Sequence, residues 1–322
     1  MSIESALNAF EGAKVLVIGD IILDIYIYGS VDRISPEAPI PILNHKNTRH
    51  ALGGAANVAA NLKGLGAEVH LISITGEDDE ADFLETMLDL EDINHTLIRL
   101  NNRPTTSKSR VISGSHQLLR IDHEISDEIN SEETDLVSHS IQSVIHNFGP
   151  AILVLEDYNK GMMTRGIIDQ LNALSLTFNI PVVVDPKKNN FFAYTGCTLF
   201  KPNFKECAQQ MPFAIEPHID SLRAADQYIR ARLHNKYTMI TLAEHGIYIS
   251  DAERCIIVPT EIRKVSDVSG AGDTVTAIAT FGVVQSLSLE SMADLANKAA
   301  GLVCAKPGVY AIHKEELIQN NN

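Results

Sequence analysis

The chain has 322 residues, 45% of them hydrophobic and 21% charged, so it can bury one large α/β domain or two smaller ones. Its net charge of −15, from 41 acidic and 26 basic residues, argues against a nucleic-acid-binding surface, because no long run of Lys or Arg offsets it. The four cysteines are scattered without a C-x-x-C pattern, which indicates a reducing compartment. With no signal-peptide pattern and no apolar run of membrane length, we expect a cytoplasmic protein.

The predicted elements begin with a short apolar run, KVLVIGD at 14–20, which is typical of a buried strand. Residues 22–45 alternate aromatic and β-branched residues and contain three prolines, so exposed or edge strands are expected there. Residues 105–122 predict a hairpin that turns at Ser113 and Gly114. We expect these two segments to leave the main domain as a small β lid.

The rest of the chain alternates apolar runs with helical segments. A helix of small residues follows the glycine pair at 53–54, and further helices follow several of the apolar runs. The apolar runs are EVHLISITG, AILVLEDY, IPVVVDP, YTMITLA, GIYIS and CIIVP. This alternation predicts an α/β fold, with a mainly parallel central sheet and helices on both faces. No linker or repeat divides the chain, so residues 1–322 are expected to form a single domain.

Residues 267–273, DVSGAGD, place two glycines around an alanine directly before an acid. The small, apolar segment that follows predicts a buried helix beginning near Gly272, whose first N–H groups could bind an anion. An acid beside a bound phosphate makes chemical sense if Asp273 takes the proton of a hydroxyl that attacks the phosphorus. The alternative is that Asp273 is only an acidic residue in the first turn of a helix.

The pair Gly53–Gly54 lets a ligand approach the backbone closely, and Asn57 follows in the first turn of the next helix. The amide of Asn57 offers donors and an acceptor, which suits a polyol. The alternative is a tight turn with Asn57 on the helix surface. The DVSGAGD motif matches neither a Walker A nor a G-x-G-x-x-G sequence, so these two modes of nucleotide binding are not predicted there.

Together, GGAANVAANLKGLGA and DVSGAGDTV, about two hundred residues apart, resemble the N- and C-terminal signatures of the PfkB, or ribokinase-like, carbohydrate kinases. The resemblance covers essentially the whole chain. It implies a ribokinase-like fold, a sugar hydroxyl as phosphoryl acceptor, and ATP with Mg²⁺ as cofactors. Two departures are Ser269, where the family often has Thr, and Ala243, where many members have Gly.

The resemblance implies roles for the residues at matching positions. Asp273 would be the general base, and the amides of Gly270, Ala271 and Gly272 would face the transferred phosphoryl group. The residues implied at the sugar are Asp24, Gly53, Gly54, Asn57 and Asp157. Those implied at the nucleotide are Lys187, Asn203, Phe204, Lys205, Glu206, Thr241, Gly246, Asn297 and Gly301. Asn203 and Glu206 would also organise the magnesium, and a monovalent cation is considered near Asp267.

Other stretches resemble the branch of the family that phosphorylates D-glycero-β-D-manno-heptose 7-phosphate at its anomeric oxygen, O1. These stretches are RISPEAP, TTSKSRVISGSHQLLRID, LEDYNKG, VDPK and KPNFKE. Two of their cations are expected to bind the substrate's own phosphate, out of Arg33, Lys108, Arg110, Arg120 and Lys160. Many relatives of this branch carry a following nucleotidyltransferase domain with an H-x-G-H motif. That motif is absent here, so a stand-alone kinase is expected.

The expected function is therefore ATP-dependent phosphorylation of this heptose phosphate, giving the 1,7-bisphosphate for ADP-heptose and lipopolysaccharide core synthesis. The alternatives are a PfkB kinase for another sugar or sugar phosphate, or a catalytically silent sugar-binding protein on the same fold. A homodimer is also expected through residues 22–45, because a small lid cannot bury both of its faces against its own domain. The residues expected at that contact are Tyr26, Ile27, Tyr28, Ile40 and Ile42.

Overall fold

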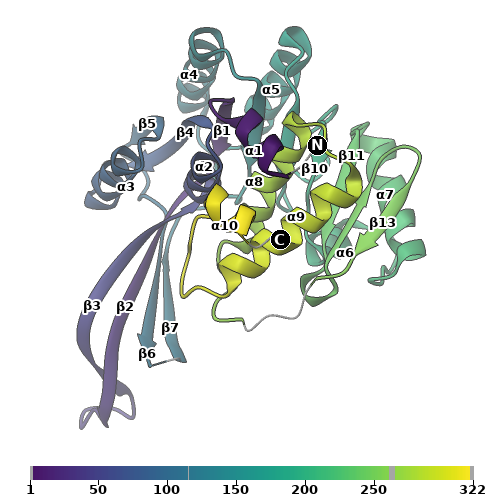
Figure 1. Ribbon diagram of the computed structural model, residues 1–322. Coiled ribbons are helices and arrows are strands. Elements are labelled where there is room, and N and C mark those ends of the chain that lie inside the picture. Colours follow the sequence, from purple (N-terminus) through teal and green to yellow (C-terminus); the bar gives the residue numbers. More distant parts are fainter. Residues whose placement is uncertain (1–2, 115, 261–264, 320–322) are drawn as a thin grey trace.

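A large, mainly parallel sheet forms the centre of the molecule. The computed structural model describes residues 3–114, 116–260 and 265–319, and within them this sheet has the order β13-β12-β11-β10-β9-β8-β1-β4-β5 (Figure 1). Its strands are β1 (Lys14–Gly19), β4 (Glu68–Gly76), β5 (Asn94–Leu100), β8 (Ile152–Glu156), β9 (Val182–Asp185), β10 (Leu199–Phe200), β11 (Tyr237–Thr241), β12 (Ile247–Ser250) and β13 (Cys255–Val258). Neighbouring strands run parallel except where β12 pairs with β11 and with β13. The predicted α/β architecture is confirmed.

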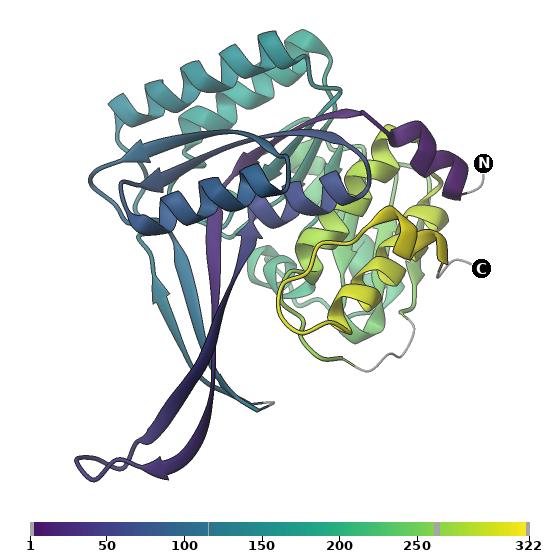
Figure 2. The same ribbon diagram turned by 60° about the vertical axis from the view of Figure 1, so that its left-hand side comes forward.

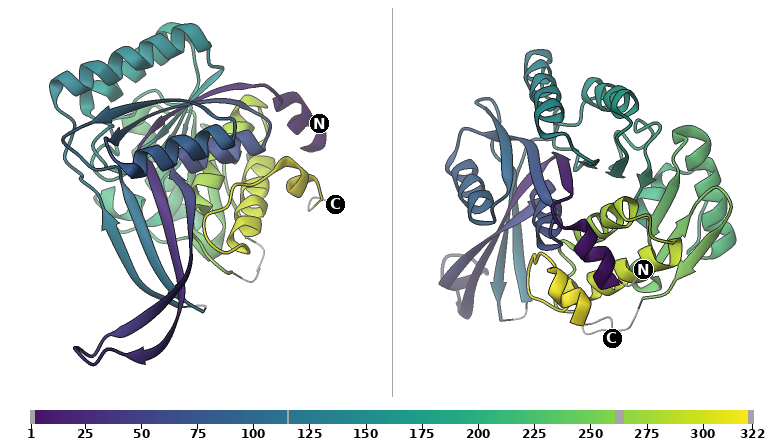
Figure 3. Two further views of the ribbon diagram at one scale, coloured as in Figure 1. Left: turned by 90° about the vertical axis from the view of Figure 1, so that its left-hand side faces the viewer. Right: turned by 45° about the horizontal axis from the view of Figure 1, so that its top comes forward.

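Helices cover both faces of this sheet, as its apolar strands require (Figure 3). In β1, Val15 and Val17 pack into one core cluster, while Leu16 and Ile18 pack into the other. The first cluster includes side chains of α1 (Ile3–Phe10), α2 (Ala55–Gly64), α3 (Asp79–Leu90), α8 (Ala271–Val284), α9 (Leu289–Cys304) and α10 (Lys314–Gln319). The second includes side chains of α4 (Ser131–Phe148), α5 (Arg165–Phe178), α6 (Phe204–Gln210) and α7 (Ile219–Leu233). No helix in the described part of the chain is long and apolar enough to cross a membrane.

A second sheet of four strands projects away from this body (Figures 1 and 2). Its order is β3 (Pro41–Gly54), β2 (Ile21–Ile34), β6 (Ser107–Ser113) and β7 (His116–His123). The segments 22–45 and 105–122 therefore share one sheet, in which β2 runs parallel to β6. The glycine pair at 53–54 ends β3, so the helix predicted to follow it begins at Ala55.

Asn61 connects three segments of the fold through hydrogen bonds. It is fully buried, and its Nδ2 donates to the carbonyl oxygen of Asn57 at 2.7 Å. Its Oδ1 accepts from the hydroxyl of Thr274 at 2.9 Å and from the backbone N–H of Ile312 at 3.0 Å. These bonds connect α2, α8 and the segment before α10, so they fix the helix turn that carries Asn57 relative to the start of α8.

Replacing this residue in an Asn61→Ala variant is expected to lower the free energy of unfolding by about 1–3 kcal/mol. The change leaves the Ile312 N–H buried without its acceptor and removes one of the two acceptors of the Thr274 hydroxyl, which keeps the carbonyl of Gly270 at 3.2 Å. Urea unfolding monitored by circular dichroism measures the loss. As a control, Asn147→Ala on the exposed side of α4 should change stability by no more than about 0.5 kcal/mol. Equal stability of the two variants would contradict this role of Asn61.

Candidate active site

Asp273 is a buried carboxylate at the start of α8, with only 4% of the residue exposed. The hydroxyl of Tyr158 donates to its Oδ1 at 2.7 Å, and Nδ2 of Asn57 donates to its Oδ2 at 2.7 Å. Burial raises the pKa of Asp273 to about 6, although both hydrogen bonds act to lower it. The group is therefore mostly ionised at neutral pH and held in one orientation, as a proton acceptor must be.

The backbone ahead of Asp273 forms an open helix N-terminus. Gly270 occupies the N-cap position with φ of 80°, and no side chain caps the helix there. A Cβ at Gly270 would lie 2.6 Å from Nδ2 of Asn57, whereas a Cβ at Gly272 would meet nothing within 4 Å. The N–H of Ala271 donates to the carbonyl of Val268 at 3.3 Å. The turn is therefore tight on the Asn57 side and open at Gly272, where an anion can approach the helix dipole.

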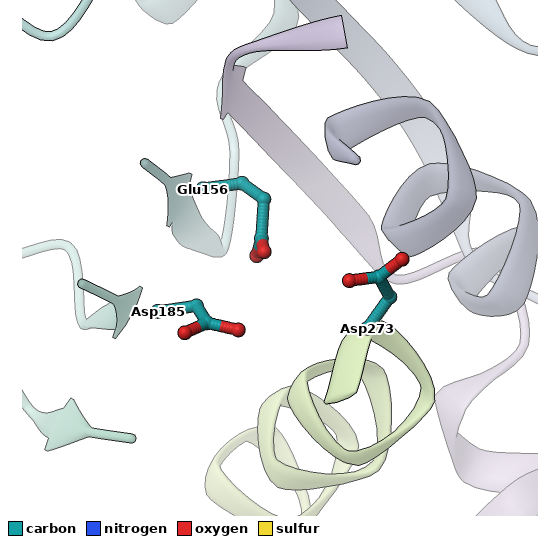
Figure 4. Close-up of side chains that lie close together, drawn as sticks. All are labelled: Glu156, Asp185 and Asp273. Atoms are coloured by element: carbon teal, nitrogen blue, oxygen red, sulfur yellow. The ribbon is translucent and has the colours of Figure 1, made fainter. Parts of the chain in front are cut away.

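Two further carboxylates point toward Asp273 from the ends of neighbouring strands (Figure 4). Glu156 is the last residue of β8 and Asp185 the last of β9, and one oxygen of each of the three groups lies within 4.8 Å of the others. Both oxygens of Glu156 and Oδ1 of Asp185 are buried without a hydrogen-bond partner among the described residues. Unpartnered buried oxygens are costly, so this cluster is suited to a cation or to a shared proton.

Two lysines compensate part of this negative charge. Nζ of Lys201 lies 2.8 Å from Oδ2 of Asp185, and Nζ of Lys187 lies 3.6 Å from its Oδ1. Burial would raise the pKa of Asp185, but the two lysines outweigh it and the pKa is lowered. Burial, and then the charge of Asp185, hold the pKa of Glu156 well above its usual range. The cluster therefore combines an Asp185 whose pKa is lowered with a Glu156 whose pKa is raised, and a bound cation would favour the ionised form of both.

The residues predicted to bind the sugar gather where β2 and β3 leave the body. Asp24 is buried and forms an ion pair with Arg110, whose guanidinium also lies 5.2 Å from the centre of the Tyr26 ring. A Cβ at Gly53 would lie 2.2 Å from Oδ2 of Asp24, so only glycine leaves room for this carboxylate. Gly54, with φ of 56°, then turns the chain into α2.

Three of the predicted phosphate-binding cations are paired with acids beside this region. Glu124 follows β7 and accepts from Nζ of Lys160 at 2.7 Å and from Nζ of Lys108 at 2.9 Å. Asp122 accepts two hydrogen bonds from Arg120, both of 2.9 Å, and the Arg120 side chain is 52% exposed. The two lysines are far less exposed, at 14% and 17%.

Arg33 and Asp157 are not placed at the sugar site as predicted. Arg33 is exposed near the distal end of the β2–β3 hairpin, nine residues beyond Asp24, which corresponds to about 30 Å along a strand. Asp157 is fully buried and holds its own loop, accepting from the N–H of Asn159, from Asn190 and from the Tyr194 hydroxyl. Its carboxylate is therefore a structural group of the loop after β8.

The residues predicted at the nucleotide form two groups. Asn203 and Glu206 form a reciprocal capping box at the start of α6, and Oε1 of Glu206 lies 2.9 Å from Nζ of Lys187. Both predicted magnesium ligands are thus engaged in the helix cap. Phe204 and Lys205 follow in the first turn of that helix, where Lys205 is exposed.

The second group lies around the end of β13. Asn297 on α9 donates to the carbonyl of Val258 at 2.9 Å, and a Cβ at Gly246 would lie 2.1 Å from the same carbonyl oxygen. Thr241 ends β11 and pairs with Asn203, while Gly301 follows one turn after Asn297 on α9. This second group is thus connected to the capping box through Thr241.

Several residues of the site were not predicted from the sequence. Tyr158 donates to Asp273 and lies under Nζ of Lys187, which is 4.7 Å from the ring centre. Glu156 and Asp185 could have been predicted as site residues, because each ends an apolar run in the sequence. The carboxyl ends of parallel strands meet at one edge of the sheet, which brings such residues together. Lys201 likewise follows β10 directly.

A buried, oriented carboxylate behind an open helix N-terminus, with lysines at the same sheet edge, is suited to phosphoryl transfer. A family model described as "pfkB family carbohydrate kinase" matches residues 13–316. The chain belongs to this family and is a carbohydrate kinase. The predicted family and enzyme class are confirmed.

Curated relatives and solved structures agree with this assignment. The chain is 39% identical over 310 residues to the "Bifunctional protein HldE" of Methylobacillus flagellatus, covering 95% of this chain and 62% of the relative. It is 40% identical to the protein of that name from Azorhizobium caulinodans, covering 95% and 64%. The chain thus spans less than two thirds of the length of these relatives.

The fold is shared with kinases of low sequence identity. Phosphofructokinase-2 from Escherichia coli, in complex with potassium, superposes with a TM-score of 0.79 at 20% identity, covering 96% of this chain and 97% of that one. Arabidopsis thaliana ribokinase complexed with ribose and ATP gives a TM-score of 0.74 at 18% identity, covering 96% and 98%. The ribokinase-like fold predicted from the two signatures is confirmed.

An Asp273→Asn variant is expected to lose roughly a hundred- to ten-thousand-fold in kcat, the usual contribution of a general base. In the wild type, kcat/KM should fall as the pH drops below about 6, because protonated Asp273 cannot accept the hydroxyl proton. ADP release measured between pH 5 and pH 8 tests both effects. The exposed Asp89→Asn change on α3 is the control and should leave the profile unchanged. An Asp273→Asn enzyme with half the wild-type turnover would exclude this base.

Proposed function

We propose that this carbohydrate kinase transfers the γ-phosphoryl group of ATP to O1 of D-glycero-β-D-manno-heptose 7-phosphate. The observation that supports this substrate is the pair Lys108 and Lys160. Both lysines converge on the carboxylate of Glu124, close to Asp24. The two cations lie close together in a chain whose net charge is −15, and in the proposed complex the phosphate of the sugar would pair with them. The sequence resemblance to the heptose branch and the relatives named HldE support the same substrate. The product would be the 1,7-bisphosphate, a precursor for ADP-heptose and lipopolysaccharide core synthesis.

The proposed transfer uses groups whose positions are described above. Asp24 would accept hydrogen bonds from sugar hydroxyls, with Gly53 leaving the space for its carboxylate. Asp273, fixed by Tyr158 and Asn57, would receive the proton of O1 as this oxygen attacks the phosphorus. The N–H groups at Gly272 and the start of α8 would stabilise the charge on the phosphoryl oxygens.

For the cofactors, we propose ATP and Mg²⁺. Lys187, Asn203 and the residues around Val258 would line the nucleotide. Glu156 and Asp185 fit a magnesium ion, because their unpartnered buried oxygens are the hard ligands that this ion prefers. They are better placed for direct ligation than Asn203 and Glu206, whose polar groups are occupied in the helix cap. Magnesium would neutralise charge on the phosphates during transfer.

A monovalent cation near Asp267 is part of the same proposal. Asp267 lies three residues before Gly270, and its Oδ1 accepts from the N–H of Ser269 at 2.9 Å. The superposed phosphofructokinase-2 is a complex with potassium. A cation held there would act on the loop that leads into the helix N-terminus, and therefore on the orientation of that anion site.

The heptose 7-phosphate should be used at least about a hundredfold better than the same sugar without its phosphate, because two charge-assisted contacts each contribute roughly tenfold or more. In a Lys160→Met variant this ratio should fall by about tenfold or more, while kcat/KM for the free sugar stays near the wild-type value. Steady-state ADP release with both sugars measures these ratios.

A matched control for this comparison is Lys63→Met, which removes a lysine paired with Asp92 on the surface of α2. Lys63→Met should leave the preference for the 7-phosphate over the free sugar unchanged. Equal use of the two sugars by the wild type would contradict the heptose 7-phosphate assignment and favour a kinase for another sugar.

We also propose that the protein acts as a homodimer through the four-stranded sheet. The apolar face of this sheet consists of residues that share one side in the strand register, namely Ile25, Ile27, Val111, Leu119 and Ile121. Leu119 and Ile121 are 55% and 52% exposed. Tyr26, which was expected at the contact, is instead buried against Arg110 and Val309 and faces the site. A second copy is a suitable occupant because it presents the same apolar face.

Light scattering should therefore report the mass of two chains for the wild type at micromolar concentration. An Ile121→Glu variant should be largely monomeric, because it places an unpaired charge in the proposed contact. Leu136→Glu, on an exposed position of α4, should remain dimeric. A monomeric wild type would rule out this contact, and so would an unchanged mass for Ile121→Glu.

A further inference from the structure

Glu124 holds both lysines of the proposed phosphate site at once. Its Oε1 accepts from Lys160 at 2.7 Å and its Oε2 accepts from Lys108 at 2.9 Å, so each oxygen has its own cation. Asp122 adds a longer contact of 3.5 Å to Lys108 and is itself paired with Arg120. The Glu124 carboxylate presents one oxygen to each of two ammonium groups, and a phosphate could pair with the same two groups from this position.

The three groups come from two parts of the fold, the β6–β7 pair and the central body. Lys108 lies on β6 of the four-stranded sheet, Glu124 follows β7, and Lys160 lies in the loop after β8 of the central sheet. Lys108 and Glu124 are diagonal neighbours across the β6–β7 pair, because Lys108 lies opposite Asp122, whereas Lys160 reaches them from the loop of the central body. The side chain of Glu124 is 24% exposed, so it can turn toward solvent without opening the core.

The backbone around these side chains is fixed. The guanidinium of Arg103 donates to the carbonyl of Lys160 at 2.7 Å and to the carbonyls of Ile125 and Asp127 at 3.3 Å. The buried Asp20 accepts the N–H of Lys160 at 3.0 Å. Since both loops are held through their main chains, a ligand that binds the lysines has to displace the Glu124 side chain and not the loop.

We propose that Glu124 is a specificity-determining residue that occupies the phosphate site as an internal anion and is displaced by the phosphate of the substrate. This inference rests on the proposed sugar-phosphate site. Two lysines and one carboxylate leave one positive charge, which a phosphate dianion can use by pairing with both lysines. A singly charged group only exchanges one carboxylate for another. Glu124 would therefore favour phosphorylated sugars over sugars that carry a carboxylate.

The test is the binding of inorganic phosphate, measured by isothermal titration calorimetry at fixed ionic strength. A Glu124→Gln variant should bind phosphate about tenfold more tightly than the wild type, because phosphate no longer competes with a charged side chain. It should also bind acetate measurably better. The exposed Glu128→Gln change in the same loop removes one negative charge as a control and should shift the dissociation constant by less than about twofold.

A Glu124→Gln/Lys160→Met double variant connects the gain to the site. If phosphate binds between the lysines, adding Lys160→Met should abolish the tenfold gain. An unchanged or weaker phosphate affinity in Glu124→Gln would overturn the proposal, because Glu124 would then position the lysines and not compete for them. A gain that survives Lys160→Met would overturn it too, since the anion would be binding elsewhere.

These outcomes can be separated from the substrate assignment. Phosphate binding needs neither ATP nor turnover. Suppose that Glu124→Gln tightens phosphate binding through Lys160, while the wild type uses the heptose and its 7-phosphate equally. The inference about Glu124 then stands and the proposed substrate is wrong. If the 7-phosphate is preferred but Glu124→Gln does not tighten phosphate binding, the proposed function stands and the inference about Glu124 fails.

Discussion

The burial of an ionised carboxylate at Asp273 is the constraint on which the arrangement of the site depends. Removing a charge from water is costly, and here two hydrogen bonds of 2.7 Å offset part of that cost. Each donor belongs to a different segment, Tyr158 after β8 and Asn57 on α2. Asn61 in turn fixes the Asn57 turn against α8. The proposed proton acceptor is therefore positioned by a connected set of buried polar groups.

The loop after β8 couples this acceptor to the rest of the site. Asp20 accepts the backbone N–H groups of Tyr158 and Lys160, at 2.8 and 3.0 Å. One loop consequently carries the hydroxyl that orients Asp273 and the lysine of the proposed phosphate site. The Tyr158 ring also lies against Lys187, on the side of the proposed nucleotide site. Burial, with the nearby charge of Asp157 as a second cause, raises the pKa of Asp20 to about 6.

The sequence was sufficient to predict the fold and the family, because both rest on local patterns. Apolar runs identify buried strands, and DVSGAGD marks a helix N-terminus followed by an acid. Residues whose roles depend on long-range contacts were harder to predict. The local sequence does not show that the Asp157 carboxylate accepts hydrogen bonds from Asn190 and Tyr194. It also does not show that Arg33 lies far along a hairpin. Glu124 was missed for the same reason, since its partners lie 16 and 36 positions away in the sequence.

The residues of the proposed site come partly from the projecting four-stranded sheet and partly from the central body. Asp24, Lys108 and Arg110, which face the proposed sugar, are carried by this sheet, whereas Asp273, Asp185 and Lys187 belong to the central body. The sheet thus supplies part of the proposed sugar contacts, and Asn57 and Lys160 of the central body supply the rest, while the groups proposed for phosphoryl transfer all lie in that body. Substitutions in the sheet can alter the accepted sugar while the packing around the carboxylate cluster is preserved. Such a division gives the scaffold a simple route by which new acceptor specificities can evolve on an unchanged chemical centre.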